Sequence, residues 1–452
     1  MKKILLIQLP TSGFTTEKVF PIGLAGLSTL VPKEMEKAGL DMNLFPDPWP
    51  VLAAQLRGFR PDIVAFSFRN MDPLAGIHSS YFPVLQTGVN LARKELPKSR
   101  IICGGPGFSL FGETILQLLP AIDYGIIGEG EAGFPLLLKE QVAIDIPGLV
   151  FRDNATIVKN RNHHADLTQL PRMDTTLFAP QDYIDTNGYV AAMGIEGKRG
   201  CSLTCGYCTY PILSGTRSRL RDPEEIVDDM EMYQGYGAKV VHFTDSVVNR
   251  PPQHLQAVCE EILTRNLTIQ WTGFFREDHL DRELADLAVQ AGLVTFYFSG
   301  DSLTNHGLNL LRKNLSKEDL FRAARITAET GVITCYHFMA NLPEETETHH
   351  QEARQTLETL FDIHQPAGNL GAVILSAIRL YPGSPLTIRL QQQGKLNKVN
   401  LLYPTYYNPQ QTSHRLHELI ALCHQRGIRD RLLSTGELGE QSSTTPWEPE
   451  KS

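Results

Sequence analysis

Residues 199–210 read RGCSLTCGYCTY and place Cys201, Cys205 and Cys208 within a single short loop. The other four cysteines of the chain are scattered, so the trio calls for a metal rather than a disulfide framework. Thiolates are the ligands that iron–sulfur clusters require. Spacings of four and three residues let one loop supply three corners of a four-iron cubane. The fourth iron is then open to a small chelating molecule.

Two other uses of the trio have to be weighed. A structural zinc site would take His163 or His164 as its fourth ligand, but such sites usually show paired CxxC knuckles. A cluster used only for electron transfer requires a fourth cysteine, and none lies nearby. The spacing therefore favours a cluster with one open iron.

Six apolar runs follow one another from residue 189 towards the carboxyl end, with helical stretches between them. They predict strands at 189–195, 239–245, 268–273, 293–299, 333–340 and 371–378. Six parallel strands indicate an incomplete (β/α)6 barrel, with its chemistry at the carboxyl ends of the strands. The trio directly follows the first of these strands. A final helix is predicted at 413–427.

The amino-terminal part shows the same alternation and predicts a separate doubly wound sheet. Its strands are predicted at 3–8, 62–68, 100–105 and 124–128, and its helices at 23–38, kinked by Pro32, and at 84–96. Glycine clusters follow two of the strands, GGPGF at 104–108 and GEGEAGF at 128–134. Ligands of such sheets bind beyond these strand ends, where glycines permit close approach. The segment 146–160 predicts a hairpin that turns at Asp153-Asn154.

The expected fold class is therefore α/β, with two domains of different design. The predicted divisions are a Rossmann-like domain at 1–155, a connector at 156–188, the barrel at 189–380, a small helical subdomain at 381–433 and a disordered tail at 434–452.

Composition limits the partners of this chain. A formal net charge of −8 argues against nucleic-acid binding, because no basic excess is available to neutralise phosphates. No apolar stretch approaches the roughly 18 residues needed to span a bilayer. The opening MKKILLIQLP resembles the start of a signal peptide, but its apolar run is short and a buried first strand explains it better. We expect a cytoplasmic protein.

The trio at the end of a first barrel strand resembles the motif of the radical S-adenosylmethionine (SAM) superfamily, and Tyr207 matches its aromatic position. The resemblance extends over about 190–380. FYFSGDSL stands where the family has a Gly-Ile-Glu-Ser-like turn, and FMANLPEET resembles its Gly-Leu-Pro-Gly-Glu-Thr segment with Asn341 and Glu344 in place of glycines. The resemblance implies a [4Fe–4S] cluster on the trio and SAM contacts from Tyr207, Asp245, Arg276, Ser299 and Asp301. The carboxylates could equally cap helices, and Arg276 could form a surface ion pair.

The amino-terminal domain resembles the cobalamin-binding domain of one branch of this superfamily. The resemblance implies cobalamin contacts from Arg69, Asn70, Gly104, Gly105, Gly107, Gly128, Glu129 and Gly130. The Asp-x-His-x-x-Gly motif that supplies a cobalt ligand in methionine synthase is missing here, which implies cobalamin held without a histidine, its corrin facing Arg69 and Asn70. One alternative is a domain that keeps the fold but binds no cobalamin. A flavodoxin-like domain is the other, but PTSGFTT after the first strand matches no strict phosphate fingerprint.

The resemblance implies an enzyme that reductively cleaves SAM and, with cobalamin, methylates an unactivated carbon of a small-molecule or natural-product substrate. It also implies an external electron donor such as flavodoxin or ferredoxin. Oxidative cyclisation and ring rearrangement need the same two cofactors and stay open. A cobalamin sensor has no need of an open iron, and a transfer-RNA methylthiolating enzyme would carry further amino-terminal cysteines. No residue pattern identifies the substrate.

Overall fold

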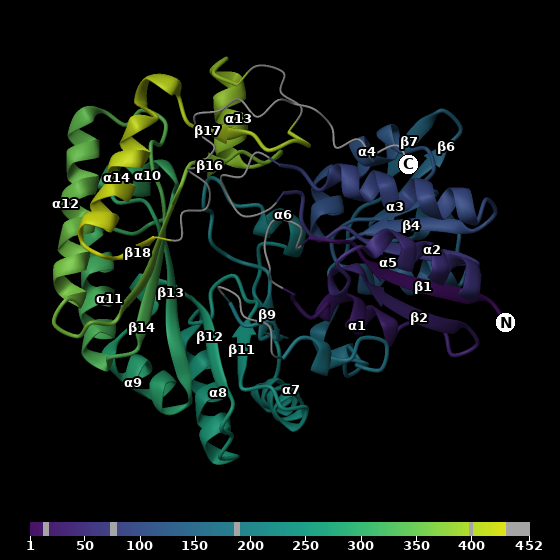
Figure 1. The fold of residues 1–452 in the computed structure, drawn as a ribbon, viewed down its shortest axis with the longest axis horizontal. Helices are drawn as coiled ribbons and strands as arrows, with labels where there is room; N and C mark the ends of the chain where they lie inside the picture. The colour runs from purple at the N-terminus through teal and green to yellow at the C-terminus, as the bar shows by residue number, and fades with distance from the viewer. Residues whose placement is uncertain (12–17, 73–78, 185–189, 397–400, 431–452) are drawn as a thin grey trace.

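A computed structural model describes residues 1–11, 18–72, 79–184, 190–396 and 401–430 of the chain. Two sheets lie side by side, each covered by helices (Figure 1). The strands of the first are mostly parallel, and those of the second are all parallel. The predicted tail at 434–452 falls outside the described residues. Within the described residues, no helix has both the length and the apolar character needed to cross a membrane.

The first sheet has the order β2-β1-β3-β4-β5-β6-β7, and its first five strands are parallel. These are β1 (Lys3–Gln8), β2 (Glu36–Asp41), β3 (Ile63–Ser67), β4 (Arg100–Gly104) and β5 (Tyr124–Ile126). Its helices are α1 (Ile22–Ser28), α2 (Pro48–Phe59), α3 (Phe82–Glu95), α4 (Pro106–Leu118) and α5 (Gly130–Leu138). The doubly wound sheet and its four predicted strands are confirmed.

The predicted helix at 23–38 is wrong in its second half. Helix α1 ends at Ser28, before Pro32, and the chain then forms β2 at the edge of the sheet. Only the last two residues of β2, Leu40 and Asp41, are buried, so its sequence lacks the apolar run that marks a central strand.

The predicted hairpin is confirmed as β6 (Leu149–Asp153) and β7 (Thr156–Lys159), which pair in antiparallel fashion. Asn154 in the turn has a φ of 54°, a left-handed conformation that asparagine tolerates well. Strand β7 belongs to the first sheet, so this sheet continues four residues beyond the predicted boundary at 155. The hairpin itself was predicted, but β7 is only partly buried, and its pattern did not assign it to the sheet.

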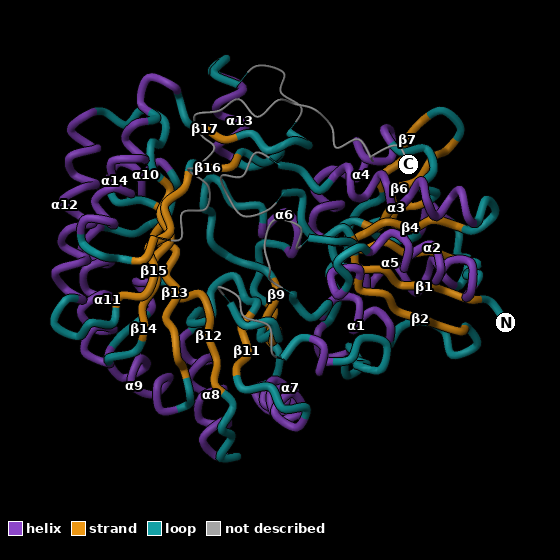
Figure 2. The backbone as a smooth tube through the Cα atoms, viewed as in Figure 1, coloured by secondary structure: helices purple, strands orange, loops and turns teal. Residues whose placement is uncertain are grey.

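The second sheet is open and entirely parallel, with the order β18-β15-β14-β13-β12-β11-β8 (Figure 2). Its strands are β8 (Gly194–Ile195), β11 (Val240–Phe243), β12 (Gln270–Phe275), β13 (Leu293–Asp301), β14 (Ile333–Met339), β15 (Leu370–Ser376) and β18 (Arg429–Asp430). The six predicted strands occur in the predicted order, which confirms the partial barrel, but the first, predicted at 189–195, is a strand only at Gly194–Ile195 within the described residues. The seventh strand, β18, spans two residues and is too short to be seen as a pattern.

Long helices cover the outer face of this barrel sheet. They are α7 (Pro223–Gly235), α8 (Pro252–Thr264), α9 (Arg282–Gln290), α11 (Lys317–Thr330) and α12 (Glu347–His364). The predicted final helix is confirmed as α14 (His414–Gln425). Shorter elements are β9 (Lys198–Arg199), α6 (Tyr210–Ser214), β10 (Arg219–Leu220), α10 (Asn305–Leu310), β16 (Ile378–Arg379), α13 (Pro385–Gln392) and β17 (Tyr406–Tyr407).

One continuous apolar core joins the two halves of the molecule. Buried residues of the first sheet, such as Ile4 and Ile63, belong to the same cluster as Trp271 and Phe296 of the barrel. At the junction, Phe20 packs edge-on against Tyr233 of α7, with 6.0 Å between ring centroids, and its N–H donates to the Ala192 carbonyl at 3.0 Å. The domains therefore share apolar packing as well as a surface contact.

The segment that departs from the family's Gly-Leu-Pro-Gly-Glu-Thr pattern keeps the backbone of a glycine turn. Asn341 has a φ of 57° and Glu344 a φ of 69°. Left-handed backbone is tolerated by asparagine and costs a glutamate roughly 1–2 kcal/mol. The turn is therefore imposed by its surroundings, since the side chain at Glu344 does not favour it.

The glycines of the GGPGF segment permit a close approach between the start of α4 and the end of β3. A Cβ at Gly107 would lie 2.9 Å from the Phe68 carbonyl oxygen and 3.2 Å from that of Arg69, and Gly105 has a φ of 98°. The Gly107 N–H donates to the Arg69 carbonyl at 2.9 Å. These contacts explain the glycines by packing within the chain.

Gly107→Ala should therefore lower the free energy of unfolding by about 1–3 kcal/mol, because its Cβ overlaps backbone that cannot move away easily. Gly26→Ala is the matched control in α1, where a Cβ meets nothing within 4 Å, and it should stabilise by about 0.5–1 kcal/mol. Anaerobic denaturant unfolding of the two variants measures both changes. Equal effects would contradict the packing account.

Candidate active site

The cysteine loop runs from the end of β9 to the start of α6 and is largely buried. Cys201 and Cys205 are 8% and 9% exposed. Three backbone hydrogen bonds hold the loop: Cys201 N–H to Gly215 O at 3.0 Å, Gly206 N–H to Leu311 O at 2.7 Å, and Leu386 N–H to Gly206 O at 2.7 Å. The loop is therefore fixed by contacts with its own hairpin, with the segment after α10 and with helix α13.

The thiols of this loop lie in a charged environment. Burial raises the pKa of Cys208 to about 12 and also raises that of Cys205, while the cations of Lys313 and Arg276 favour the Cys205 thiolate. Cys208 Sγ accepts a hydrogen bond from the Tyr210 N–H at 3.4 Å. Metal binding must supply the remaining stabilisation of the thiolates, as it does when ligands lose protons on coordination.

A zinc site on this loop would need a fourth ligand. His164, one of the two candidates, instead faces Glu129, with 3.4 Å between His164 Nδ1 and Glu129 Oε1. Three thiols on one loop match the three protein ligands of a four-iron cluster with one open iron.

Tyr207, Ser299 and Asp301 come together around a residue that the sequence reasoning missed, Lys313. Its Nζ lies 2.6 Å from Asp301 Oδ2 and donates to the Ser299 carbonyl at 2.8 Å. The Tyr207 hydroxyl donates to the same carboxylate oxygen of Asp301. Asp301 has a φ of 64° at a register shift of β13, a strained backbone that persists only where surrounding contacts fix it.

Arg276 is buried at the carboxyl end of β12, so the alternative of a surface ion pair is wrong. It is 2% exposed, and its Nε donates to Asp278 at 2.7 Å. Its Nη2 donates to the Lys313 and Asn314 carbonyls, whereas Nη1 has no hydrogen-bond partner among the described residues. A buried guanidinium therefore keeps one donor free beside the cysteine loop.

The neighbouring Glu277 is the second site residue without a signal in the sequence. Its carboxyl group is fully buried, and neither oxygen has a hydrogen-bond partner among the described residues. Burial raises the pKa of this carboxyl to about 7, although the nearby cations of Lys313 and Arg276 oppose the shift.

These residues fit the cofactors that the motif implies. The loop supplies three thiols, so a four-iron cluster bound to it would keep one iron for a chelating molecule. Arg276 Nη1 is an unused buried donor suited to a carboxylate. Asp301 is suited to hydroxyl or amino groups. A zwitterionic ligand such as SAM matches this donor set.

Asp245 lies at the same end of the barrel, but its carboxylate serves the cysteine loop. It accepts hydrogen bonds from the N–H groups of Gly197 at 2.8 Å and Lys198 at 3.1 Å. Burial raises its pKa to about 6, and the Lys198 ammonium at 3.7 Å opposes that shift. Asp245 thus ties the start of the loop to β11, and contact with SAM stays a prediction.

The predicted corrin-facing residues gather at one edge of the first sheet. Arg69 and Asn70 follow β3, and their backbone lies against Gly107, whereas Gly105 lies against Phe68. The strand order reverses between β1 and β3, and ligands of such sheets bind at the carboxyl ends of the strands at that point. Parts of both loops at this point, 12–17 and 73–78, lie outside the described residues. Direct contact with cobalamin stays a prediction.

The second predicted group, Gly128, Glu129 and Gly130, follows β5. Gly128 has a φ of 71°, and its N–H donates to Ser109 Oγ at 2.9 Å. Burial opposes ionisation of Glu129, but hydrogen bonds from Arg219 and from the Ala165 N–H outweigh it and lower the pKa. This carboxylate therefore contacts an arginine of the barrel domain.

Glu277→Gln should stabilise the protein increasingly as the pH rises. Because the folded pKa is raised, the folded state binds more protons than the unfolded state between pH 4.5 and about 7, and wild-type stability falls across that window. The amide cannot ionise, so the variant should gain up to about 3 kcal/mol on wild type by pH 8. Unfolding midpoints at pH 5 and pH 8 measure this. Glu283→Gln, exposed on α9, is the control, and equal pH profiles for both variants would contradict the assignment.

Comparison with known proteins agrees with this arrangement. The radical SAM superfamily model matches residues 195–357, and the B12 binding domain model matches residues 16–138. The uncharacterized methyltransferase PH0819 of Pyrococcus horikoshii is 23% identical over 360 residues, 76% of this chain and 75% of that protein. The anaerobic magnesium-protoporphyrin IX monomethyl ester cyclase of Cereibacter sphaeroides is 24% identical over 372 residues, 78% of this chain and 57% of that enzyme.

Among solved structures, the fold is similar to that of TsrM from Kitasatospora setae, a radical SAM methyltransferase with cobalamin and a [4Fe–4S] cluster bound. The TM-score is 0.73 at 21% identity, covering 87% of this chain and 78% of that chain. This likeness shows the same fold. The chain therefore carries a radical SAM domain at 195–357, preceded by a B12 binding domain at 16–138.

Proposed function

We propose that this protein is a cobalamin-dependent radical SAM methyltransferase that acts on a carbon of a small molecule or natural product. The observation that carries the proposal is that the carboxyl ends of the two sheets meet. The cysteine hairpin after β8 contacts the loop after β5 through Arg219 and Glu129. Asp72, after β3, pairs with Arg379, after β15. Both predicted cofactor sites therefore lie along one junction.

Each cofactor supplies chemistry that protein side chains lack: the cluster provides the electron that cleaves SAM, and cobalamin carries a methyl group. The chain's own residues bind and orient. The three thiolates hold the cluster, and Arg276 Nη1 receives the carboxylate of SAM. Lys313 and Tyr207 fix the Asp301 carboxylate in a position to contact the amino or hydroxyl groups of SAM.

A buried ion pair connects the loop after β3 to the start of the carboxyl-terminal subdomain. Arg379 Nε lies 2.7 Å from Asp72 Oδ2, and both side chains are almost fully buried. The Tyr381 hydroxyl donates to Asp72 Oδ1 at 3.2 Å, and the Arg379 guanidinium lies over the Tyr381 ring. The carboxyl-terminal subdomain is thereby held against the loop that follows Arg69 and Asn70.

Oxidative cyclisation is the second candidate, because the cyclase relative aligns with a similar share of this chain. For either reaction we propose flavodoxin or ferredoxin as the electron donor. All seven cysteines are free thiols, which fits the reducing cytoplasm.

The proposal is tested on protein purified without oxygen from cells supplied with iron and cobalamin. We expect about four irons and one cobalt per chain, and 5′-deoxyadenosine on addition of SAM and a reductant. Cys201→Ala, Cys205→Ala and Cys208→Ala should each abolish 5′-deoxyadenosine, whereas Cys259→Ala, buried on α8, should retain it. Activity that survives in any trio variant would refute the ligand assignment. Iron without cobalt would refute the cobalamin step alone.

Arg69→Ala should change the visible spectrum of bound cobalamin or lower its occupancy, with the iron content unchanged. The guanidinium lies near Asp41 and Tyr81 at the carboxyl end of the first sheet, so its loss alters the charge facing the corrin. Absorption spectra and cobalt analysis measure this, with Arg57→Ala on α2 as the control. An unchanged spectrum would show that the corrin lies elsewhere.

A further inference from the structure

The two stems of the cysteine loop form a small hairpin that carries two arginines opposite each other. Strands β9 and β10 pair in antiparallel fashion, and Arg219 is the direct partner of Arg199. Like charges at opposite positions of a strand pair repel. The hairpin therefore needs carboxylates from elsewhere to hold both side chains.

Glu196 of the barrel domain pairs with Arg199, and the remaining carboxylates come from the other domain. Arg219 makes two hydrogen bonds to Glu129, one of them from Nη1 to Oε2 at 2.8 Å. Arg199 Nη1 lies 3.5 Å from Glu129 Oε2, and its Nη2 donates to Glu131 Oε1 at 2.8 Å. The Glu129 side chain is only 6% exposed. One nearly buried carboxylate of the cobalamin-binding domain thus bridges both stems of the cysteine loop.

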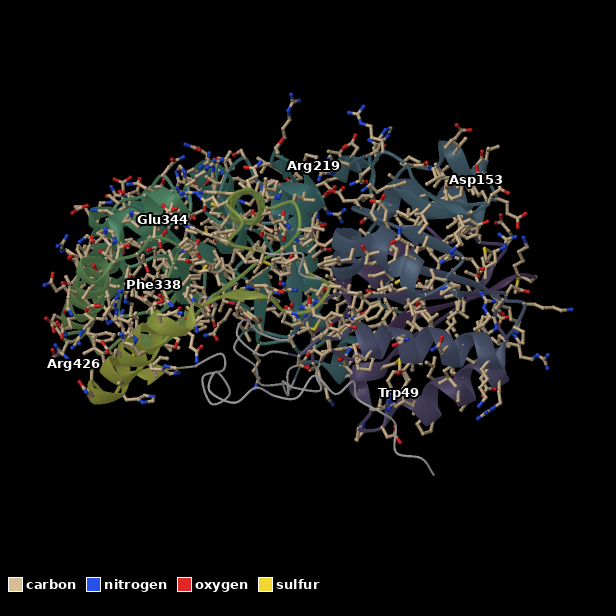
Figure 3. The ribbon with its side chains drawn as sticks, turned by 90° about the horizontal axis from the view of Figure 1, so that it is seen from above. Trp49, Asp153, Arg219, Phe338, Glu344 and Arg426 are labelled. Carbon is tan, nitrogen blue, oxygen red and sulfur yellow. The ribbon has the colours of Figure 1, made fainter. Side chains whose placement is uncertain are left out.

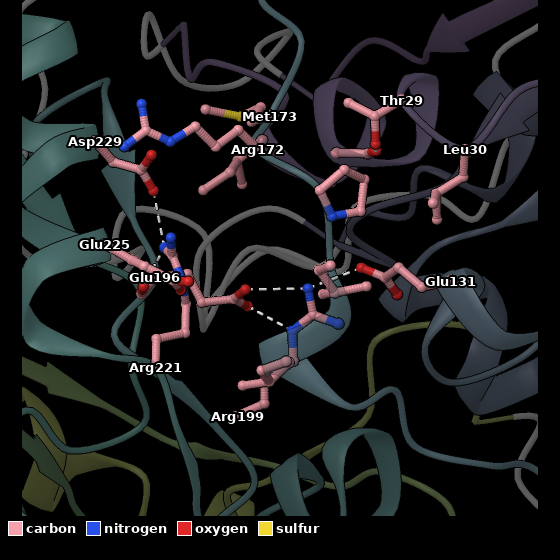
Figure 4. A pocket seen from close by; sticks show the side chains of 16 residues that line it. Thr29, Leu30, Glu131, Arg172, Met173, Glu196, Arg199, Arg221, Glu225 and Asp229 are labelled. Carbon is pink, nitrogen blue, oxygen red and sulfur yellow. Dashed lines mark hydrogen bonds and ion pairs between the residues drawn. The ribbon is translucent and has the colours of Figure 1, made fainter.

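The side chains of this network reach the cysteines through short backbone links. Arg199 is separated from Cys201 by one residue. Arg219 Nη2 donates to the Ser214 carbonyl at 3.0 Å, and the next carbonyl, that of Gly215, accepts the Cys201 N–H. Figure 3 shows Arg219 at the junction of the two domains. Figure 4 shows Arg199 between Glu196 of its own domain and Glu131 of the other.

The other end of the network lies in the glycine loop predicted to contact cobalamin. Glu129 stands between Gly128 and Gly130, and the Gly128 backbone is left-handed. The Glu129 carboxylate also accepts the Ala165 N–H at 2.8 Å. A ligand bound at this loop therefore acts on the Glu129 carboxylate and, through it, on both arginines of the hairpin.

We propose that Glu129, Arg199 and Arg219 are positioning residues that make the binding of cobalamin and the binding of SAM interdependent. This inference rests on the proposed function. The first ligand to bind orders the network, and the second then binds to a site that is already ordered, so each ligand tightens the binding of the other. Thermodynamic linkage requires the two effects to be equal.

The experiment measures the Kd of hydroxocobalamin by visible spectroscopy on cluster-loaded enzyme, with and without saturating SAM and with no reductant present. For wild type, SAM should lower this Kd by about fivefold or more. In Glu129→Gln and Arg219→Gln the ratio of the two Kd values should fall to near one. Arg219→Lys keeps the charge but loses the two-pronged geometry, so its ratio should lie between those values.

Asp229→Asn is the matched control. It removes an ion pair of 2.8 Å between Asp229 and Arg221, which is of comparable burial and lies close to the network but entirely within the barrel domain (Figure 4). Its Kd ratio should equal that of wild type. A network that only stabilised the fold would lower the melting temperature of the variants and leave their ratio unchanged.

A ratio near one in wild type, or an unchanged ratio in both Gln variants, would overturn the inference while leaving the proposed function intact. Wild-type enzyme that binds no hydroxocobalamin would instead contradict the proposed function, and the inference with it. If Glu129→Gln does not fold, the series Arg219→Lys and Arg219→Gln decides the question.

Discussion

A loop that supplies three ligands to one cluster has no regular structure of its own, so it must be held from outside. Here Cys201 is tied to the hairpin, Gly206 to the segment after α10 and to α13, and the start of the loop to Asp245. Each tie comes from a different part of the chain. The barrel and the carboxyl-terminal subdomain therefore both hold this loop in place.

The predicted strands were recognisable because a parallel sheet buries both of its faces and leaves continuous apolar runs. Apolar runs did not predict the strands that are only partly buried or very short. Strand β2 is an edge strand with two buried residues, and β18 has only two residues, so neither produces a pattern. Pro32 marked the interruption of the first predicted helix correctly, but propensity alone did not show that a strand follows it.

The site residues also divide into those that a sequence pattern reveals and those that only contacts in the fold reveal. The trio was predicted from its spacing, and Asp301 from the resemblance of its local motif. Lys313 and Glu277 acquire their meaning only through contacts between segments, since Lys313 reaches back to Asp301 and Glu277 is enclosed by the barrel. Glu129 shows a third case. Its motif indicated a cofactor loop, and the structure adds an arginine of the other domain as its direct partner.

The shared core around Phe20 and Tyr233 has a consequence for how ligands enter. Separating the two domains would expose apolar surface from both, at a cost of about 25 cal/mol for each Å². A hinge between the halves is therefore an expensive way to admit a molecule as large as cobalamin. Exchange of the ligand by local rearrangement of the loops would leave this shared core intact.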